Sequence, residues 1–149
     1  MAFPELSHSP VPLREAEADA LILALPPLPD AGDILADWPG LQAALEAVGF
    51  TGAAGATVRA YAPDATGTPL VVVGTGSDPD AATLRDAVGA AVRTTTGFDV
   101  VAIGAPAVAG TAGAARALAE GAVIGGYRFD GYKTVPGPVR ATRIVLHAE

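Results

Sequence analysis

The chain has 149 residues, of which 50% are hydrophobic and 17% are charged, and its formal net charge is −7. This length and composition suit one folded domain with a real core, and they exclude a disordered tail. The nine Lys and Arg residues are scattered along an acidic chain. A phosphate backbone requires clustered basic residues, so we expect no nucleic-acid partner.

The sequence shows no pattern typical of a targeting signal or a membrane span, and it offers no cysteine chemistry. The longest apolar runs, near Leu21–Leu25 and Leu70–Val73, are far shorter than the ~20 residues that span a bilayer. The N-terminal segment has no basic region followed by an apolar one, so we predict neither a signal peptide nor a membrane anchor. The chain contains no cysteine. This excludes disulfides and is compatible with a cytoplasmic protein.

The first part of the chain predicts one strongly buried strand. A short edge strand is expected near Phe3–Leu6, because prolines are tolerated at a sheet edge. The apolar run Ala20–Leu25 is stopped by two prolines and suits a strand buried on both faces. The stretch Pro26–Gly40 reads as a loop with a helical turn. A short helix is predicted over Leu41–Val48, ended by Gly49.

Strands and helices alternate after this point. Alternating polarity predicts a half-exposed strand over Ala56–Ala62, and Leu70–Gly74 predicts a second buried strand. The sequence Asp78-Pro79-Asp80 then opens a helix, with aspartate at the N-cap and proline at the first helical position. A third buried strand is predicted over Asp99–Ile103.

The last part of the chain predicts a glycine-bearing helix and a final strand. The helix is expected over Ala112–Gly126, capped by Thr111, and a strand over Thr142–Leu146. Gly121 and Gly125 lie four residues apart on the helix, which leaves one side bare enough for close packing. The order of elements predicts an α/β fold with a mainly parallel mixed sheet covered on both faces, in one three-layer α/β/α domain over residues 1–149.

One strand-to-helix turn resembles a phosphate-binding loop. Gly74-Thr75-Gly76-Ser77 follows a buried strand, as in dinucleotide-binding motifs. The third glycine of that motif would fall at Pro79, and the nearby aspartates would repel a phosphate. A tight turn followed by an acidic helix cap is therefore the better prediction.

Metal-ligating and nucleophilic patterns are also missing. His8 and His147 lie near opposite ends of the sequence, and no spacing suggests a metal pair. The remaining candidates are two acid pairs, three serines and the only lysine: Asp30/Asp33, Asp78/Asp80, Ser7, Ser9, Ser77 and Lys133. The acid pairs suit loop solvation and helix capping, and no serine lies in a nucleophile motif. We therefore predict no catalytic, cofactor-binding or metal-binding residue in this chain.

The segment that ends the glycine-bearing helix carries a family resemblance. Glu120-Gly121, then Gly125 and Gly126, then Tyr127-Arg128-Phe129-Asp130 and Tyr132-Lys133-Thr134 resemble the segment that closes the N-terminal domain of cytosolic leucyl aminopeptidases. The order of upstream elements is also similar, so the resemblance covers nearly the whole chain. It implies a macro-domain-like fold.

The resemblance also implies a function for the parent protein. In this family the N-terminal domain performs no chemistry, and a following catalytic domain binds two divalent metals, zinc or manganese. The implied parent is a cytoplasmic hexamer that removes N-terminal residues from peptides. The partners of this domain would be its own catalytic domain and sister subunits. We therefore expect the gene to continue past Glu149.

Two other classes of function stay open. The loop Gly104–Gly113 resembles the glycine-rich loops of macro domains, which bind ADP-ribose. Against this, macro domains usually carry an Asn-Ala pair after an early buried strand, whereas this chain has Pro26-Pro27 there and contains no asparagine. A stand-alone interaction protein is the third class.

Overall fold

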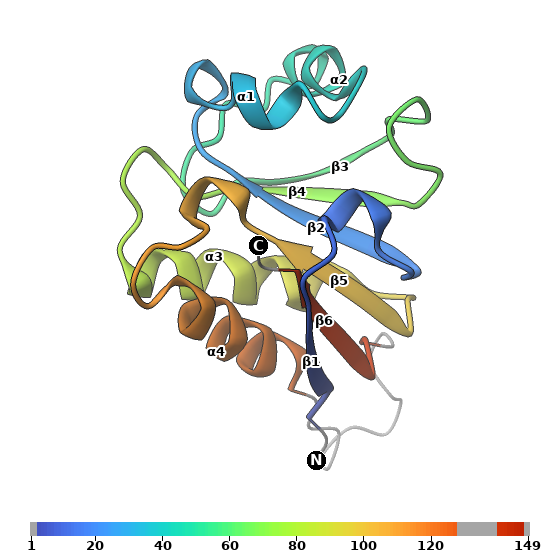
Figure 1. Ribbon diagram of the computed structural model, residues 1–149, viewed down its shortest axis with the longest axis vertical. Helices are drawn as coiled ribbons and strands as arrows, with labels where there is room; N and C mark the ends of the chain where they lie inside the picture. Colours follow the sequence, from blue (N-terminus) through green and yellow to red (C-terminus); the bar gives the residue numbers. More distant parts are fainter. Residues whose placement is uncertain (1–2, 128–139, 148–149) are drawn as a thin grey trace, which may run out of the picture.

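The computed structural model describes residues 3–127 and 140–147, and it shows a β-sheet between two layers of helices (Figure 1). The strands are β1 (Glu5–Ser9), β2 (Ala20–Leu25), β3 (Thr57–Ala60), β4 (Leu70–Gly74), β5 (Val100–Gly104) and β6 (Arg143–His147). The α-helices are α1 (Gly32–Leu35), α2 (Leu41–Ala47), α3 (Ala81–Thr94) and α4 (Ala114–Gly126). Three short 3₁₀ turns are η1 (Leu13–Glu15), η2 (Leu28–Asp30) and η3 (Pro106–Val108).

The sheet is mixed but mainly parallel. Its strand order is β1-β6-β5-β2-β4-β3. The first five strands in this order run parallel to one another, and β3 pairs antiparallel with β4 at the far edge. Helices α3 and α4 cover one face, and α1 and α2 cover the other (Figure 1). The predicted three-layer α/β/α fold is confirmed.

Strand β2 shows how the sheet divides the core into two halves. All six of its residues are buried, as the unbroken apolar run predicts. Successive side chains of a strand point to opposite faces. Ala20, Ile22 and Ala24 therefore belong to the core beneath α3 and α4. The intervening leucines belong to the core beneath α1 and α2.

The predicted elements are all present, and several of them have shifted boundaries. The edge strand lies at Glu5–Ser9 rather than Phe3–Leu6, because its register is set by pairing with β6. The half-exposed strand shortens to Thr57–Ala60. The helical turn expected between Pro26 and Gly40 is α1.

Both predicted helix caps need correction. The N-cap of α3 lies two residues later than expected, because Asp80 rather than Asp78 accepts a hydrogen bond from the Thr83 N–H, at 2.7 Å. Thr111 does not cap α4 through its side chain. The N-cap of α4 is Gly113, whose φ of 79° lies in the left-handed region that glycine tolerates.

Helices α3 and α4 pack through glycines, as the spacing of Gly121 and Gly125 predicts. A Cβ atom on Gly121 would lie 2.5 Å from the carbonyl oxygen of Arg85, and one on Gly125 would clash with the carbonyl oxygen of Gly89. Such backbone-to-backbone approach leaves no room for a larger side chain.

The C-terminal end of α4 is held by Arg140, which follows the segment Glu120–Thr134 in the sequence. Arg140 donates hydrogen bonds from Nη1 to the carbonyl oxygens of Gly125 and Tyr127. A guanidinium at a helix C-terminus satisfies carbonyls that have no partner inside the helix. The Arg128–Lys133 part of the segment lies outside the described residues.

Candidate functional site

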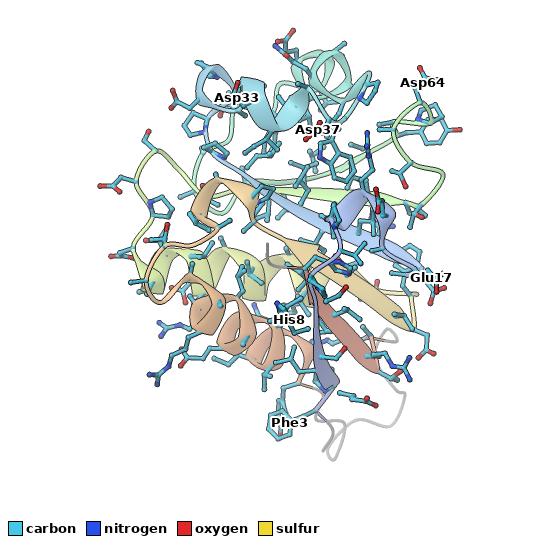
Figure 2. The ribbon with its side chains drawn as sticks, in the orientation of Figure 1. Phe3, His8, Glu17, Asp33, Asp37 and Asp64 are labelled. Carbon is cyan, nitrogen blue, oxygen red and sulfur yellow. The ribbon has the colours of Figure 1, made fainter. Side chains whose placement is uncertain are left out.

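A crevice of about 600 Å³ opens at the carboxyl ends of β5 and β6. One wall is formed by η1 and α1, and the opposite wall by the connection from β5 to α4, which is the predicted glycine-rich loop Gly104–Gly113. In Figure 2, Asp33 and Asp37 mark α1 and the segment that follows it.

The topology explains why a crevice forms there. Strands β2 and β5 are neighbours, but the chain leaves β2 toward the α1 and α2 face and leaves β5 toward the α4 face (Figure 1). Connections that diverge from adjacent parallel strands leave a gap at their carboxyl ends, which is where α/β proteins bind ligands. The gap here is partly filled by Leu13, because a Cβ atom on Gly104 would lie 3.0 Å from that side chain.

Two contacts fix the walls of the crevice. Arg14 Nη1 donates to the carbonyl oxygen of Asp37 at 2.6 Å, which joins η1 to the segment after α1. His147 Nδ1 lies 2.7 Å from the carbonyl oxygen of Val11, which joins the end of β6 to the segment before η1. Because a carbonyl oxygen only accepts, Nδ1 of His147 carries the hydrogen.

The crevice has an apolar interior and an acidic rim. Leu13, Trp38 and Leu118 are buried residues that line it. The exposed carboxylates of Glu15, Asp33 and Asp37 line it as well, against the single guanidinium of Arg14. This balance of charge disfavours a nucleotide, because a diphosphate would face three carboxylates.

Sequence reasoning found only one wall of this crevice. The glycine-rich loop was recognised, and Asp33 was interpreted as loop solvation. Nothing local in the sequence indicates that Leu13, Trp38 and Leu118 converge, because these residues are far apart in the chain and apolar residues at such positions are normal core.

The first two backbone donors of the turn after β4 already bond within the protein. The backbone N–H of Thr75 donates to the carbonyl oxygen of Leu25, and that of Gly76 donates to the carbonyl oxygen of Gly52. The Thr75 hydroxyl is buried and donates within the protein. A Cβ atom on Gly74 would clash with the backbone of Gly52 and Ala53, so this glycine serves close packing. The acidic cap predicted after this turn is present, at Asp80 rather than at Asp78.

The two histidines are closer in space than in sequence. They lie on the neighbouring strands β1 and β6, with His8 opposite Leu146 and Ser9 opposite His147. Because side chains alternate along a strand, the two imidazoles point to opposite faces of the sheet. They therefore do not form a ligand pair.

No metal centre is assembled by residues 3–127 and 140–147, since no three His, Asp or Glu side chains gather there. The acid pairs separate into different roles: Asp80 caps α3, and Asp33 lines the crevice. Lys133 lies outside the described residues. Whether this chain binds a cofactor or carries a catalytic residue stays at the level of prediction. In the same described ranges, no helix has the length and apolarity to cross a membrane.

A family model decides the relationship of this chain to known proteins. The model described as "Cytosol aminopeptidase family, N-terminal domain" matches residues 33–136. The chain belongs to this family. The matched range includes helices α3 and α4, which pack against each other through glycines, and the residues of α1 that line the crevice. It confirms the resemblance seen in the sequence.

Curated relatives agree with the family match. The chain is 36% identical over 138 residues to the probable cytosol aminopeptidase of Streptomyces avermitilis, covering 78% of this chain and 26% of the relative. It is 34% identical over 134 residues to that of Micrococcus luteus, covering 82% of this chain and 26% of the relative. The chain thus spans about a quarter of the length of these relatives.

Solved structures share the fold. A tomato leucine aminopeptidase mutant matches with a TM-score of 0.78 and 16% identity, covering 99% of this chain and 33% of that one. The bottromycin maturation enzyme BotP matches with a TM-score of 0.66 and 24% identity, covering 89% of this chain and 28% of that one. At these identities the likeness concerns the fold alone.

Proposed function

We propose that this chain acts as the non-catalytic N-terminal domain of a longer aminopeptidase, which removes N-terminal amino acids from peptides. The observation that carries the proposal is the family match over residues 33–136, together with curated relatives of whose length this chain covers only about a quarter. The relatives are named cytosol aminopeptidases, so we also assign the protein to the cytoplasm.

The chemistry of the parent enzyme would belong to residues outside this domain. The family resemblance implies two divalent metals, zinc or manganese. The described residues do not fit such a centre, because no three ligating side chains come together. We therefore derive no catalytic step from this chain, and we propose that its role is structural.

Exposed apolar side chains support a role in assembly. Phe3 is 62% exposed, and its ring contacts the ring of Tyr127 in a tilted arrangement with centroids 4.8 Å apart, beside the edge strand β1. Leu6 on β1 and Ile124 on α4 are also exposed. Contact with another domain or subunit would remove these apolar side chains from water. We propose the catalytic domain and sister subunits of a hexamer as the partners.

The first test concerns activity. We expect the purified chain, supplied with Mn²⁺ or Zn²⁺, not to hydrolyse leucine p-nitroanilide, with a full-length relative as the positive control. Hydrolysis that co-purifies with the chain through successive columns, and changes when the chain is mutated, would show that the domain is catalytic.

The second test concerns the structural role. In the Streptomyces avermitilis relative, the matching segment is either deleted or replaced by this chain. We expect the deletion to lose assembly by size-exclusion chromatography and the replacement to restore it together with peptidase activity. A deleted enzyme that assembles and works like its parent would contradict the structural role.

A further inference from the structure

We propose that the crevice between η1, α1 and the β5–α4 connection binds a small hydrophobic amine, meaning a protonated amino group on a branched or aromatic hydrocarbon. The proposal goes beyond the structural role, and it does not depend on it. It rests on the shape of the crevice, on its apolar interior and on the sign of the charge at its rim.

The size of the crevice and its apolar lining favour a small ligand with a hydrocarbon group. A volume of about 600 Å³ lies within the usual range for small-molecule sites. Trp38, Leu13 and Leu118 come from three separate segments and line the crevice, and Ile34 and Val108 in the same lining are half-buried. The contacts made by Arg14 and His147 hold the walls in place before any ligand arrives.

The rim selects a positive charge. Glu15, Asp33 and Asp37 line the crevice, and none of them belongs to an ion pair among residues 3–127 and 140–147. Arg14 is the one basic side chain in the lining besides His147, and it already donates to the Asp37 carbonyl oxygen. A protonated amine at the mouth would gain attraction from the surplus carboxylates, whereas an anion would be repelled.

An amine fits this lining better than a metal ion or a nucleotide. No three ligating side chains gather in the described part of the chain, so the rim carboxylates do not form a metal-coordinating set. A nucleotide would place phosphates against the three rim carboxylates. A primary amine needs only one or two carboxylates and keeps the remainder of its hydration shell at an open rim.

The chain contains its own reporter of binding. Trp38 is the only tryptophan in the sequence, and it lines the crevice. We would titrate the chain at neutral pH and low salt with isoamylamine, following Trp38 fluorescence. The neutral analogue isoamyl alcohol and the anionic analogue isocaproate are matched controls of similar shape. We expect a saturable change with the amine, at least about tenfold weaker binding of the two analogues, and weakening by added salt.

Variants then locate the bound amine. Asp33→Asn and Asp37→Asn should each weaken amine binding about threefold, the size expected for an exposed ion pair. Asp64→Asn is the matched control, because this exposed aspartate does not line the crevice and lies apart from Asp33 and Asp37 in Figure 2. It should leave the affinity unchanged.

A second pair of variants tests the apolar interior. Ala115→Leu places a larger side chain at the exposed first turn of α4, where Ala115 lines the crevice, and it should weaken the amine severalfold or more. Ala82→Leu makes the same change at the exposed first turn of α3, outside the crevice, and should have no effect. Both variants should retain the parent circular dichroism.

Each contrary result overturns the proposal. Absence of a saturable fluorescence change with isoamylamine would show that the crevice does not bind the amine. Equal binding of the amine and the alcohol, or equal effects of Asp33→Asn and Asp64→Asn, would show that the rim does not select charge. Tight binding of ADP-ribose, added as a further titration, would replace the amine with the macro-type ligand.

Discussion

Asp80 is the residue that sets the start of α3, and its effect on stability depends on charge. Its carboxylate accepts the Thr83 N–H at 2.7 Å, and this backbone hydrogen bond lowers its pKa below the ordinary value of 3.8. Asp78, two residues earlier, does not form the cap. We expect Asp80→Ala to lower the melting temperature more than the control Asp78→Ala, measured by thermal denaturation at neutral pH.

The lowered pKa of Asp80 also predicts a pH dependence. The stabilisation is present above the unfolded pKa, near 3.8, and is lost as the pH falls through the lower folded value, because the unfolded state then binds more protons. Asp80→Asn keeps an oxygen acceptor but has no charge. The stability difference between Asp80 and Asp80→Asn should therefore be constant from pH 7 to about pH 5 and should shrink below pH 4. A difference that grows on acidification would contradict this account.

At the scale of elements, the contact between α3 and α4 depends on three glycines. Gly121 and Gly125 of α4 approach the carbonyl oxygens of Arg85 and Gly89, so even one added methyl group meets backbone rather than a movable side chain. We expect Gly125→Leu to destabilise the fold by about 2 kcal/mol or more, as overpacking does, measured by urea denaturation.

A glycine in open space provides the control for that variant. Gly32 in α1 has no neighbouring atom within 4 Å of an added Cβ, and its φ lies outside the left-handed region. Gly32→Ala should leave the unfolding free energy within about 0.5 kcal/mol of the parent, or raise it slightly. If Gly125→Leu and Gly32→Ala unfold alike, the close contact does not exist in solution.

At the scale of the whole molecule, the order of the strands determines which amides are protected. Strands β2, β5 and β4 lie inside the sheet and are almost wholly buried, whereas β1 and β3 form its edges. Edge strands open locally at lower free-energy cost than central ones. Hydrogen exchange should therefore be slowest in β2 and its neighbours and fastest in β1 and β3. Equal protection of β1 and β2 would argue for a partner strand on the β1 edge.

The sequence alone determined which segments form the sheet and which helix carries the close contact. Ala20–Leu25 and Leu70–Gly74 were predicted with the bounds that the structure shows, because an apolar run stopped by turn residues is a local signal. The spacing of Gly121 and Gly125 likewise predicted close packing. The caps were less reliable, since neighbouring aspartates compete for one position and only the helix geometry selects Asp80.

Only the tertiary structure decided which of these elements lie side by side. Periodicity reports which face of a strand or helix is buried, but it carries no information about which distant segment covers that face. The crossovers between strands determine the antiparallel pairing of β3 and the adjacency of β1 and β6. They also determine that Leu13, Trp38 and Leu118 line one crevice together with the acidic rim. The crevice is a product of this strand order, because it lies where the connections after β2 and β5 leave toward opposite faces.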